Sequence, residues 1–255
     1  MTLYTRDTFL LFGNATALLK VFAVRQDGYD GPIEILPADG QDGLTIQGGT
    51  IPAGEDSVCL TVSLAPSFWP KGAEQPNGKM AFSPKTLRLV GKMADSAETV
   101  PVRALEDQEQ AFIYHHLMEL DEIEARFRGG RKPQFELISP APLVFRNGVA
   151  ELEMGVEFRP PNPKKPKAKP VRMSFNKETD FRLSPESAAF TLENAQFDQS
   201  VFKATVRITD PEKAAKQGNL ILEIRQPWQI KDAEGKPKPP SSPFGWLPAV
   251  PYRVE

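Results

Sequence analysis

The chain of 255 residues has very little cysteine, and this shortage limits the classes of protein to which it can belong. Cys59 is the only cysteine, so no disulfide can form within the chain and a disulfide-stapled extracellular scaffold is excluded. It lies in the alternating run SVCLTVSL at 57–64, which is typical of a small buried residue in a strand. Domains of this size can bury an adequate core without disulfides, so export is still compatible with the sequence.

Strong net charge and long apolar runs are also missing. The formal net charge of -2 gives no general attraction to nucleic acid or to an anionic membrane. The run FLLFGNATALLKVFAV is broken by Gly13, Asn14 and Lys20, so we expect no transmembrane segment, and the N-terminus lacks the pattern of a signal peptide. We expect an extracellular, cell-envelope or periplasmic location as part of a longer exported chain, or a cytoplasmic one if Met1 is the true start.

Nucleophile and cofactor signatures are absent as well. The sequence contains no GxSxG, no GxxxxGK[ST], no GxGxxG after a strand and no CxxC. A glycosidase built on two carboxylates would leave no local signature, although the division into two small sandwiches argues against it. The sequence predicts a protein that is not an enzyme and that needs no cofactor, with calcium as the one ion that its loops could hold.

Proline is plentiful, and it separates short apolar runs. The 25 prolines are about twice the usual share, which favours many short strands joined by rigid turns. In the first part of the chain we expect strands at 17–25, 32–36, 44–47, 57–65, 86–94 and 98–105. This series predicts an immunoglobulin-like β-sandwich over residues 1–105.

The hydrophobic spacing then changes. Apolar residues fall at intervals of four, three, three and four in Ile113, Leu117, Leu120, Ile123 and Phe127. This is one helical stripe, with acidic residues before it and arginines and glycines after it. We therefore expect one amphipathic connecting helix over residues 106–130.

Strand patterns resume after this segment and continue to the end of the chain. We expect strands in the second part at 133–139, 142–146, 149–159 and 219–228, and in the runs VRMSFN, DFRLS, AAFTLE and SVFKATVRIT. They predict a second β-sandwich over residues 131–255. The fold class is therefore all-β, with two immunoglobulin-like β-sandwich domains joined by one helix.

The only two histidines are adjacent, at His115 and His116. On a helix they would project about 100° apart, so they would not bind one metal from the same face. The favoured interpretation is that His116 packs at the domain junction with Ile113, Leu117 and Leu120. The alternative is a metal-dependent hydrolase around His115, with the carboxylate of Glu119 one turn away.

Two glycine-rich loops, DGYDG at 27–31 and DGQDG at 39–43, each carry two aspartates. Asp-Gly is common turn chemistry, and we expect turns here. If a metal binds anywhere, the first group to consider is a calcium set of carboxylates. Its members would be Asp27, Asp30, Asp39 and Asp42.

Two further features point to binding surfaces. The lysine-rich segment 160–170 lacks interleaved aromatics, which favours a solvated loop over a nucleic-acid site. Trp69 lies in the insertion at 66–84, and together with Tyr29 it could stack on a sugar. A carbohydrate-binding module is therefore an alternative function, with polysaccharide as the partner.

Several stretches taken together resemble a known group of proteins. They are FAVRQDGYDGPIEI, IPAG, LRLVG, QAFIYHHL, QGNLILE and WLPAVPYRVE. The chain resembles the C-terminal Ig-like β-sandwich region of large secreted, planctomycete-type bacterial proteins that often carry pre-peptidase C-terminal (PPC) domains. The resemblance implies a non-enzymatic accessory region that acts in adhesion, envelope organisation or domain presentation. Its partners would be neighbouring domains of a longer chain or another envelope protein.

Overall fold

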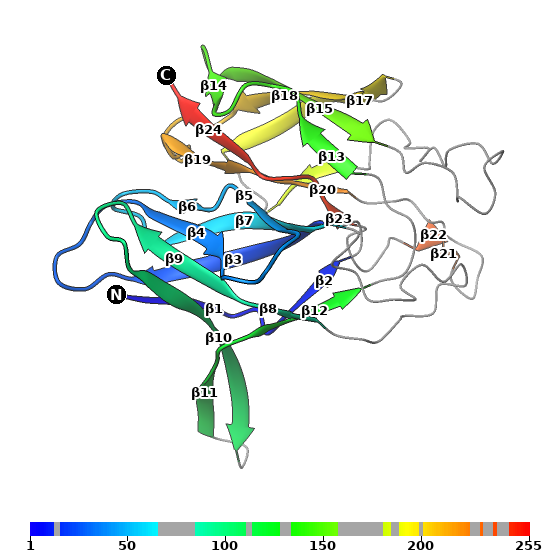
Figure 1. Ribbon diagram of the computed structural model, residues 1–255. Helices are drawn as coiled ribbons and strands as arrows, with labels where there is room; N and C mark the ends of the chain where they lie inside the picture. Colours follow the sequence, from blue (N-terminus) through cyan, green and yellow to red (C-terminus); the bar gives the residue numbers. More distant parts are fainter. Residues whose placement is uncertain are drawn as a thin grey trace. The chain divides into compact units, whose positions relative to one another are not determined.

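The computed structural model describes residues 1–12, 16–65, 85–110, 114–127, 134–157, 181–184, 189–198, 201–224, 230–231, 237–238 and 245–255 (Figure 1). All regular structure in these residues is β-strand, which confirms the predicted all-β class. Throughout the described part of the chain, no helix is long and apolar enough to cross a membrane.

The chain divides into two compact units. Unit 1 comprises Met1–Phe12 and Thr16–Gly130, and unit 2 comprises Gly13–Ala15 and Arg131–Glu255. Each unit has its own cluster of buried apolar side chains.

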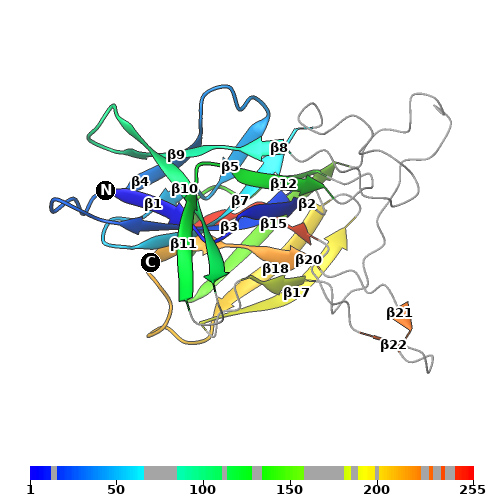
Figure 2. The ribbon, with the colours of Figure 1, turned by 90° about the horizontal axis from the view of Figure 1, so that it is seen from below.

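Unit 1 is built from the first twelve strands. They are β1 (Thr2–Thr5), β2 (Phe9–Phe12), β3 (Thr16–Val24), β4 (Ile33–Pro37), β5 (Leu44–Gln47), β6 (Thr50–Ile51), β7 (Ser57–Leu64), β8 (Lys85–Leu87), β9 (Leu89–Met93), β10 (Thr99–Gln110), β11 (Tyr114–Leu120) and β12 (Ile123–Phe127). The main sheet has the order β5-β7-β3-β1-β10-β9-β4-β6, and β11 pairs with β10 (Figure 2). A smaller sheet has the order β2-β12-β8.

Alternation of apolar and polar residues explains why these segments form strands. In β3, Leu19 and Val21 are fully buried, whereas Lys20 between them is exposed. The same pattern puts Leu60 and Val62 of β7 into the core. The predicted strands at 17–25, 32–36, 44–47 and 57–65 are confirmed to within a residue or two. The strand predicted at 98–105 is confirmed as β10, which continues to Gln110. The strand predicted at 86–94 is divided between β8 and β9.

The long strand β10 changes its partners along its length. Thr99, Val100 and Pro101 pair with β9, and Val102, Arg103 and Ala104 pair in parallel with β1. From Ala104 to Gln110 the same strand pairs antiparallel with β11. The last part of β10 and all of β11 form a two-stranded hairpin that projects from the sheet of unit 1 (Figure 1). We call residues 104–110 and 114–120 the β10–β11 hairpin.

The helix predicted over residues 106–130 is wrong. Residues in this range belong to β10, β11 and β12 instead. The stripe of apolar residues combined positions from separate strands. In β12 the actual period is two, since Ile123 and Ala125 are buried while Arg126 is exposed. Pairing between strands overrides a spacing that only resembles a helical one.

Unit 2 contains the remaining strands. They are β13 (Gln134–Leu137), β14 (Leu143–Phe145), β15 (Val149–Glu157), β16 (Phe181–Leu183), β17 (Phe190–Asp198), β18 (Val201–Ile208), β19 (Gln217–Leu220), β20 (Leu222–Ile224), β21 (Ile230–Lys231), β22 (Pro237–Lys238), β23 (Gly245–Trp246) and β24 (Val250–Val254). Its sheets have the orders β13-β15-β18-β17, β14-β24-β19, β16-β20-β23 and β21-β22. The predicted run VRMSFN lies outside the described residues. The strand predicted at 219–228 is divided between β19 and β20, and its residues 225–228 are not described. The other predicted strands of this half are confirmed with shifted ends.

Aromatic side chains form much of the core of unit 2. The ring of Phe145 lies 5.6 Å from that of Tyr252 in an edge-to-face arrangement, and Phe190 lies 5.2 Å from Tyr252. A tight turn at Asn147 and Gly148, both with positive φ, leads from β14 into β15, and Arg146 and Val149 exchange backbone hydrogen bonds across it. Unit 2 is therefore held by side chains from strands far apart in the sequence.

Candidate functional site

The β10–β11 hairpin determines where the two histidines lie. Cross-strand neighbours are Glu109 with His115 and Gln108 with His116. Successive residues of a strand point to opposite faces, so the two imidazoles lie on opposite faces of the hairpin. On a helix the two side chains would point about 100° apart, whereas on this strand they point in opposite directions.

His115 is held by a neighbouring carboxylate. Its Nδ1 atom lies 3.0 Å from Oδ1 of Asp107, and both side chains are more than half exposed. A His–Asp pair is part of many hydrolytic sites, but it needs a nucleophile. The strands of the hairpin, ALEDQEQ and YHHLMEL, contain no serine, threonine or cysteine. The geometry therefore favours a hydrogen bond between the two side chains that steadies the hairpin.

The base of the hairpin is fixed by an arginine. Nη1 of Arg103 donates a hydrogen bond of 2.7 Å to Oε2 of Glu119 and lies 3.7 Å from Oδ1 of Asp121. Arg103 sits next to Ala104, which is fully buried. The ion pair therefore marks the point where β10 leaves the core and enters the hairpin.

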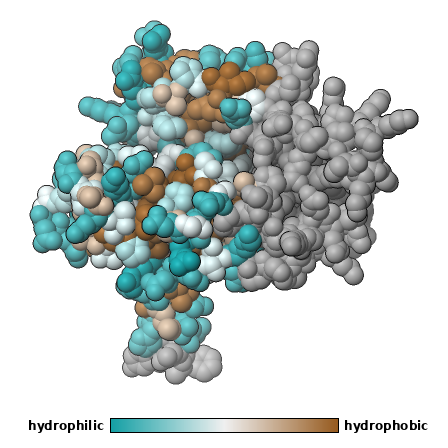
Figure 3. Space-filling view, in the orientation of Figure 1, coloured by the Kyte–Doolittle hydropathy of each residue, from teal (hydrophilic) through white to brown (hydrophobic). Residues whose placement is uncertain are grey.

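The hairpin exposes two large apolar side chains. Leu117 is 65% exposed and Met118 is 45% exposed, and they belong to opposite faces of β11. In Figure 3 hydrophobic surface appears on this projection among hydrophilic residues. The hairpin therefore leaves one large apolar side chain in contact with water on each of its faces.

The residues predicted to pack the two halves together have different surroundings, and their packing between the halves stays a prediction. His116 and Leu117 are exposed on the hairpin, and Leu120 is partly buried against the core of unit 1. Ile113 lies outside the described residues. His116, Leu117 and Leu120 belong to unit 1, and the first two lie on the surface of that unit.

The charge of the hairpin is of one sign. Between Ala104 and Leu120 the sequence has four carboxylates and no lysine or arginine. Asp107 faces His115 and Glu119 faces Arg103. Among the described residues, no cation pairs with Glu106 or Glu109, and both are exposed. The hairpin therefore presents unneutralised negative charge beside its apolar side chains.

The aspartates of the two glycine-rich loops lie in turns. Asp27 and Gly28 both have positive φ, as do Gly40 and Gly43, which confirms the turn chemistry predicted for these loops. Across the described residues, no three histidine, cysteine, aspartate or glutamate side chains gather into a metal-binding group. The calcium site at Asp27, Asp30, Asp39 and Asp42 therefore gains no support from the geometry.

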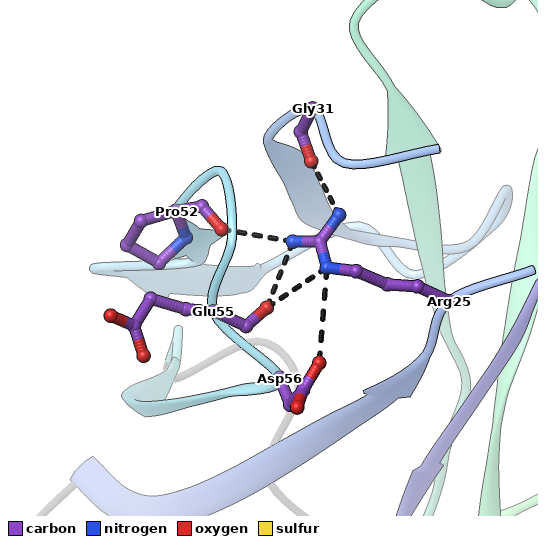
Figure 4. Close-up of polar contacts among 5 residues, drawn as sticks. All are labelled: Arg25, Gly31, Pro52, Glu55 and Asp56. Atoms are coloured by element: carbon purple, nitrogen blue, oxygen red, sulfur yellow. Dashed lines mark hydrogen bonds and ion pairs between the residues drawn. The ribbon is translucent and has the colours of Figure 1, made fainter. Parts of the chain in front are cut away.

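An arginine that the sequence patterns did not single out organises the first of these loops (Figure 4). The guanidinium of Arg25 donates to the backbone carbonyls of Gly31, Pro52 and Glu55 at 2.7 to 3.1 Å, and Nε lies 4.0 Å from Oδ1 of Asp56. Its side chain is 11% exposed. Arg25 thus ties the 26–31 loop to the turn before β7, and its donors are engaged by the protein.

The aromatic candidates for sugar binding have different positions. The hydroxyl of Tyr29 donates to the carbonyl of Pro32 at 2.7 Å and accepts from the amide of Ala94 at 3.3 Å. Its ring packs against the core of unit 1, so Tyr29 anchors a loop. Trp69 and the lysine-rich segment 160–170 lie outside the described residues.

Sequence patterns missed Leu117 and Met118 as exposed residues, because the segment was interpreted as a helix. Charge gave a partial signal. The seventeen residues from Ala104 to Leu120 include four carboxylates and no lysine or arginine, which favours a solvent-exposed segment without indicating its conformation.

No protein-family model matches the chain, and no curated protein matches it. One solved structure that it is similar to contains fibronectin(III)-like modules of Clostridium thermocellum CbhA. The identity is 8%, the alignment covers 99% of this chain and 93% of that chain, and the TM-score is 0.23. A TM-score this low carries no argument about fold or function.

Proposed function

We propose that the chain is a non-enzymatic binding region of an exported bacterial protein and that it contacts a protein partner through the β10–β11 hairpin. We also propose that each unit is an immunoglobulin-like sandwich. Its role would be adhesion, envelope organisation or the presentation of a neighbouring domain. The observation that carries the binding function is the exposure of Leu117 and Met118 on a hairpin that leaves the body of unit 1.

A two-stranded hairpin without a covered face has little stability of its own in water. In the β10–β11 hairpin, Leu117 and Met118 are on opposite faces, so the described core of unit 1 shields neither. Contact with a partner would remove apolar surface from water, which stabilises the complex by about 25 cal/mol for each Å² of apolar surface buried. This gain supports a binding role for a hairpin held on a rigid sheet.

Neither alternative function has comparable support. A hydrolase around His115 would need a nucleophile or further ligands, and its one close polar partner in the described residues is Asp107. A carbohydrate site at Tyr29 would need a free ring face and hydroxyl, whereas this residue anchors a loop. The other predicted ring, Trp69, lies outside the described residues and supplies no observation for such a site. We therefore propose neither.

The binding function is tested with envelopes isolated from the source bacterium. The fluorescently labelled chain is expected to bind them, and the double variant Leu117→Ser/Met118→Ser is expected to lose at least tenfold in affinity while keeping its circular dichroism spectrum. Treatment of the envelopes with proteinase K should abolish binding. Binding that survives protease and is lost after periodate oxidation would favour a polysaccharide and contradict the proposal.

Export is tested separately. Its support is the resemblance to regions of large secreted proteins. An antibody against the chain is expected to detect it in the envelope or medium after cell fractionation. Detection in the cytoplasmic fraction alone would overturn this part of the proposal.

A further inference from the structure

The hairpin has open strand edges as well as exposed side chains. We propose, on the basis of the function proposed above, that a lysine- or arginine-bearing strand of the partner protein pairs with the free edge of β11. The partner strand would extend the β10–β11 ladder by one strand, and its long basic side chains would reach across β11 toward the carboxylates of β10.

The register shows which edges are free. β1 pairs with β10 as far as Thr5 and Ala104, and β11 lies on the opposite edge of β10. Within the described residues, β11 pairs with no strand other than β10. Alternate residues of β11 therefore direct their N–H and C=O groups away from β10, toward the edge where a further strand can pair.

This edge lacks the usual protection. Natural proteins block pairing at exposed edges with lysine, proline, bulges or very short strands. β11 has seven residues, YHHLMEL, and contains neither lysine nor proline. Its pairing with β10 is continuous from Leu120 to Tyr114, with no bulge. The edge is long, regular and open, as strand addition requires.

Charge selects the occupant. Glu106 lies on one face of the hairpin and Glu109 on the other, and both are exposed. Both belong to β10, so a strand added to β11 would lie about 10 Å from their strand, and long lysine or arginine side chains on the same face would reach toward them. Its apolar residues would cover Leu117 or Met118. A second copy of this hairpin would instead bring two acidic hairpins together without supplying a lysine or arginine. The acidic character therefore favours a basic partner over self-association.

The first test uses two synthetic probes on the full chain. One is an acetylated and amidated heptapeptide of alternating lysine and valine, and its matched control replaces lysine with glutamate. We expect the lysine peptide to bind at least tenfold more tightly in fluorescence anisotropy, and its affinity to fall as salt rises, since exposed charges are screened. Equal affinities, or dimerisation of the chain through the hairpin in sedimentation, would overturn the proposal.

The second test separates strand pairing from simple charge attraction. With the lysine peptide bound, we expect amide hydrogen exchange to slow at least fivefold at alternate residues of β11 and to stay unchanged in β7. The variant Glu106→Gln/Glu109→Gln should bind the lysine peptide severalfold more weakly. The control variant Glu136→Gln/Glu151→Gln in unit 2 should bind it with unchanged affinity. Tight binding without protection of β11 would contradict strand addition.

The two proposals fail in different ways. If the chain binds envelopes through Leu117 and Met118 but prefers neither peptide, the binding function stands and the basic strand is wrong. If the chain binds neither envelopes nor the lysine peptide, both are wrong.

Discussion

The two halves of β10 lie in very different surroundings. In the first half Val102 and Ala104 are buried and Arg103 between them is open to solvent. In the second half the strand has left the core, and Glu106, Asp107 and Glu109 are all exposed. One strand therefore supplies both a structural element and a surface projection. The difference indicates that packing in the core constrains the first half, whereas packing does not constrain these exposed side chains of the second half.

The largest expected contrast comes from one substitution made in both regions. Leu60→Ala in the body should lower the free energy of unfolding by about 3 kcal/mol, because it leaves a cavity at a fully buried site. Leu117→Ala in the hairpin should change it by less than about 0.5 kcal/mol. Urea denaturation followed by circular dichroism measures both. Equal losses would show that Leu117 packs in solution and would break the comparison.

A second contrast concerns two arginines of the body. Arg25→Ala should cost about 2 kcal/mol, because three backbone carbonyls lose a charged donor in a mostly buried site. Arg88→Ala is the matched control, since its ion pair with Glu122 at 3.9 Å is exposed on both sides. Its effect should stay below about 0.5 kcal/mol. A small effect of Arg25→Ala would mean that the carbonyls find other donors.

The base of the hairpin should show a smaller effect. The coupling between Arg103 and Glu119 should be about 0.5 kcal/mol in a double-mutant cycle, because the pair is exposed despite its distance of 2.7 Å. Amide exchange in β11 should increase more than exchange in β3 in the Arg103→Ala variant. An equal increase in both strands would show that this arginine stabilises the body rather than the hairpin.

The smallest expected effect is one of pH. Burial raises the pKa of Asp7 above its ordinary value, against hydrogen bonds from the Lys20 backbone and the Thr5 hydroxyl that lower it. The native state therefore holds this proton more firmly than the unfolded state does. The resulting stability is fully present below the unfolded pKa and is lost as pH rises through the folded pKa. Asp7→Asn should reduce this loss of stability with rising pH. Urea denaturation between about pH 4 and 7 measures the free energy of unfolding in both proteins. The same pH profile in the variant and in the wild type would contradict the prediction.

Local patterns predicted the body of unit 1 well and failed on the hairpin for a physical reason. Burial of one face imposes a period of two, as in Leu19, Val21, Leu60 and Val62, and this period is visible in sequence. No face of the hairpin is covered in this way, so YHHLMEL carries no such alternation, and a helical spacing appeared by chance. In the hairpin the conformation is set by backbone pairing between β10 and β11 rather than by the spacing of apolar residues.

Residues of the candidate site were recoverable only in part. His115 and His116 drew attention through their rarity, but their separation depends on a strand geometry that the sequence did not signal. The proximity of Arg25 to Gly31, Pro52 and Glu55 depends on loops whose path is fixed by the surrounding sheet. Backbone acceptors leave no residue signature, so such a contact is invisible before the fold is known.

The position of β1 has a consequence for the order in which the chain folds. This strand lies between β3 and β10, and it pairs in parallel with Val102, Arg103 and Ala104, about one hundred residues later in the chain. During synthesis the amino-terminal strand can pair with β3 early, but its other edge stays unsatisfied until residue 104 has emerged. The β10–β11 pairing is local and needs only the residues next to it. The hairpin has little stability of its own, so it depends on a sheet that is complete only after Val102, Arg103 and Ala104 have paired with β1.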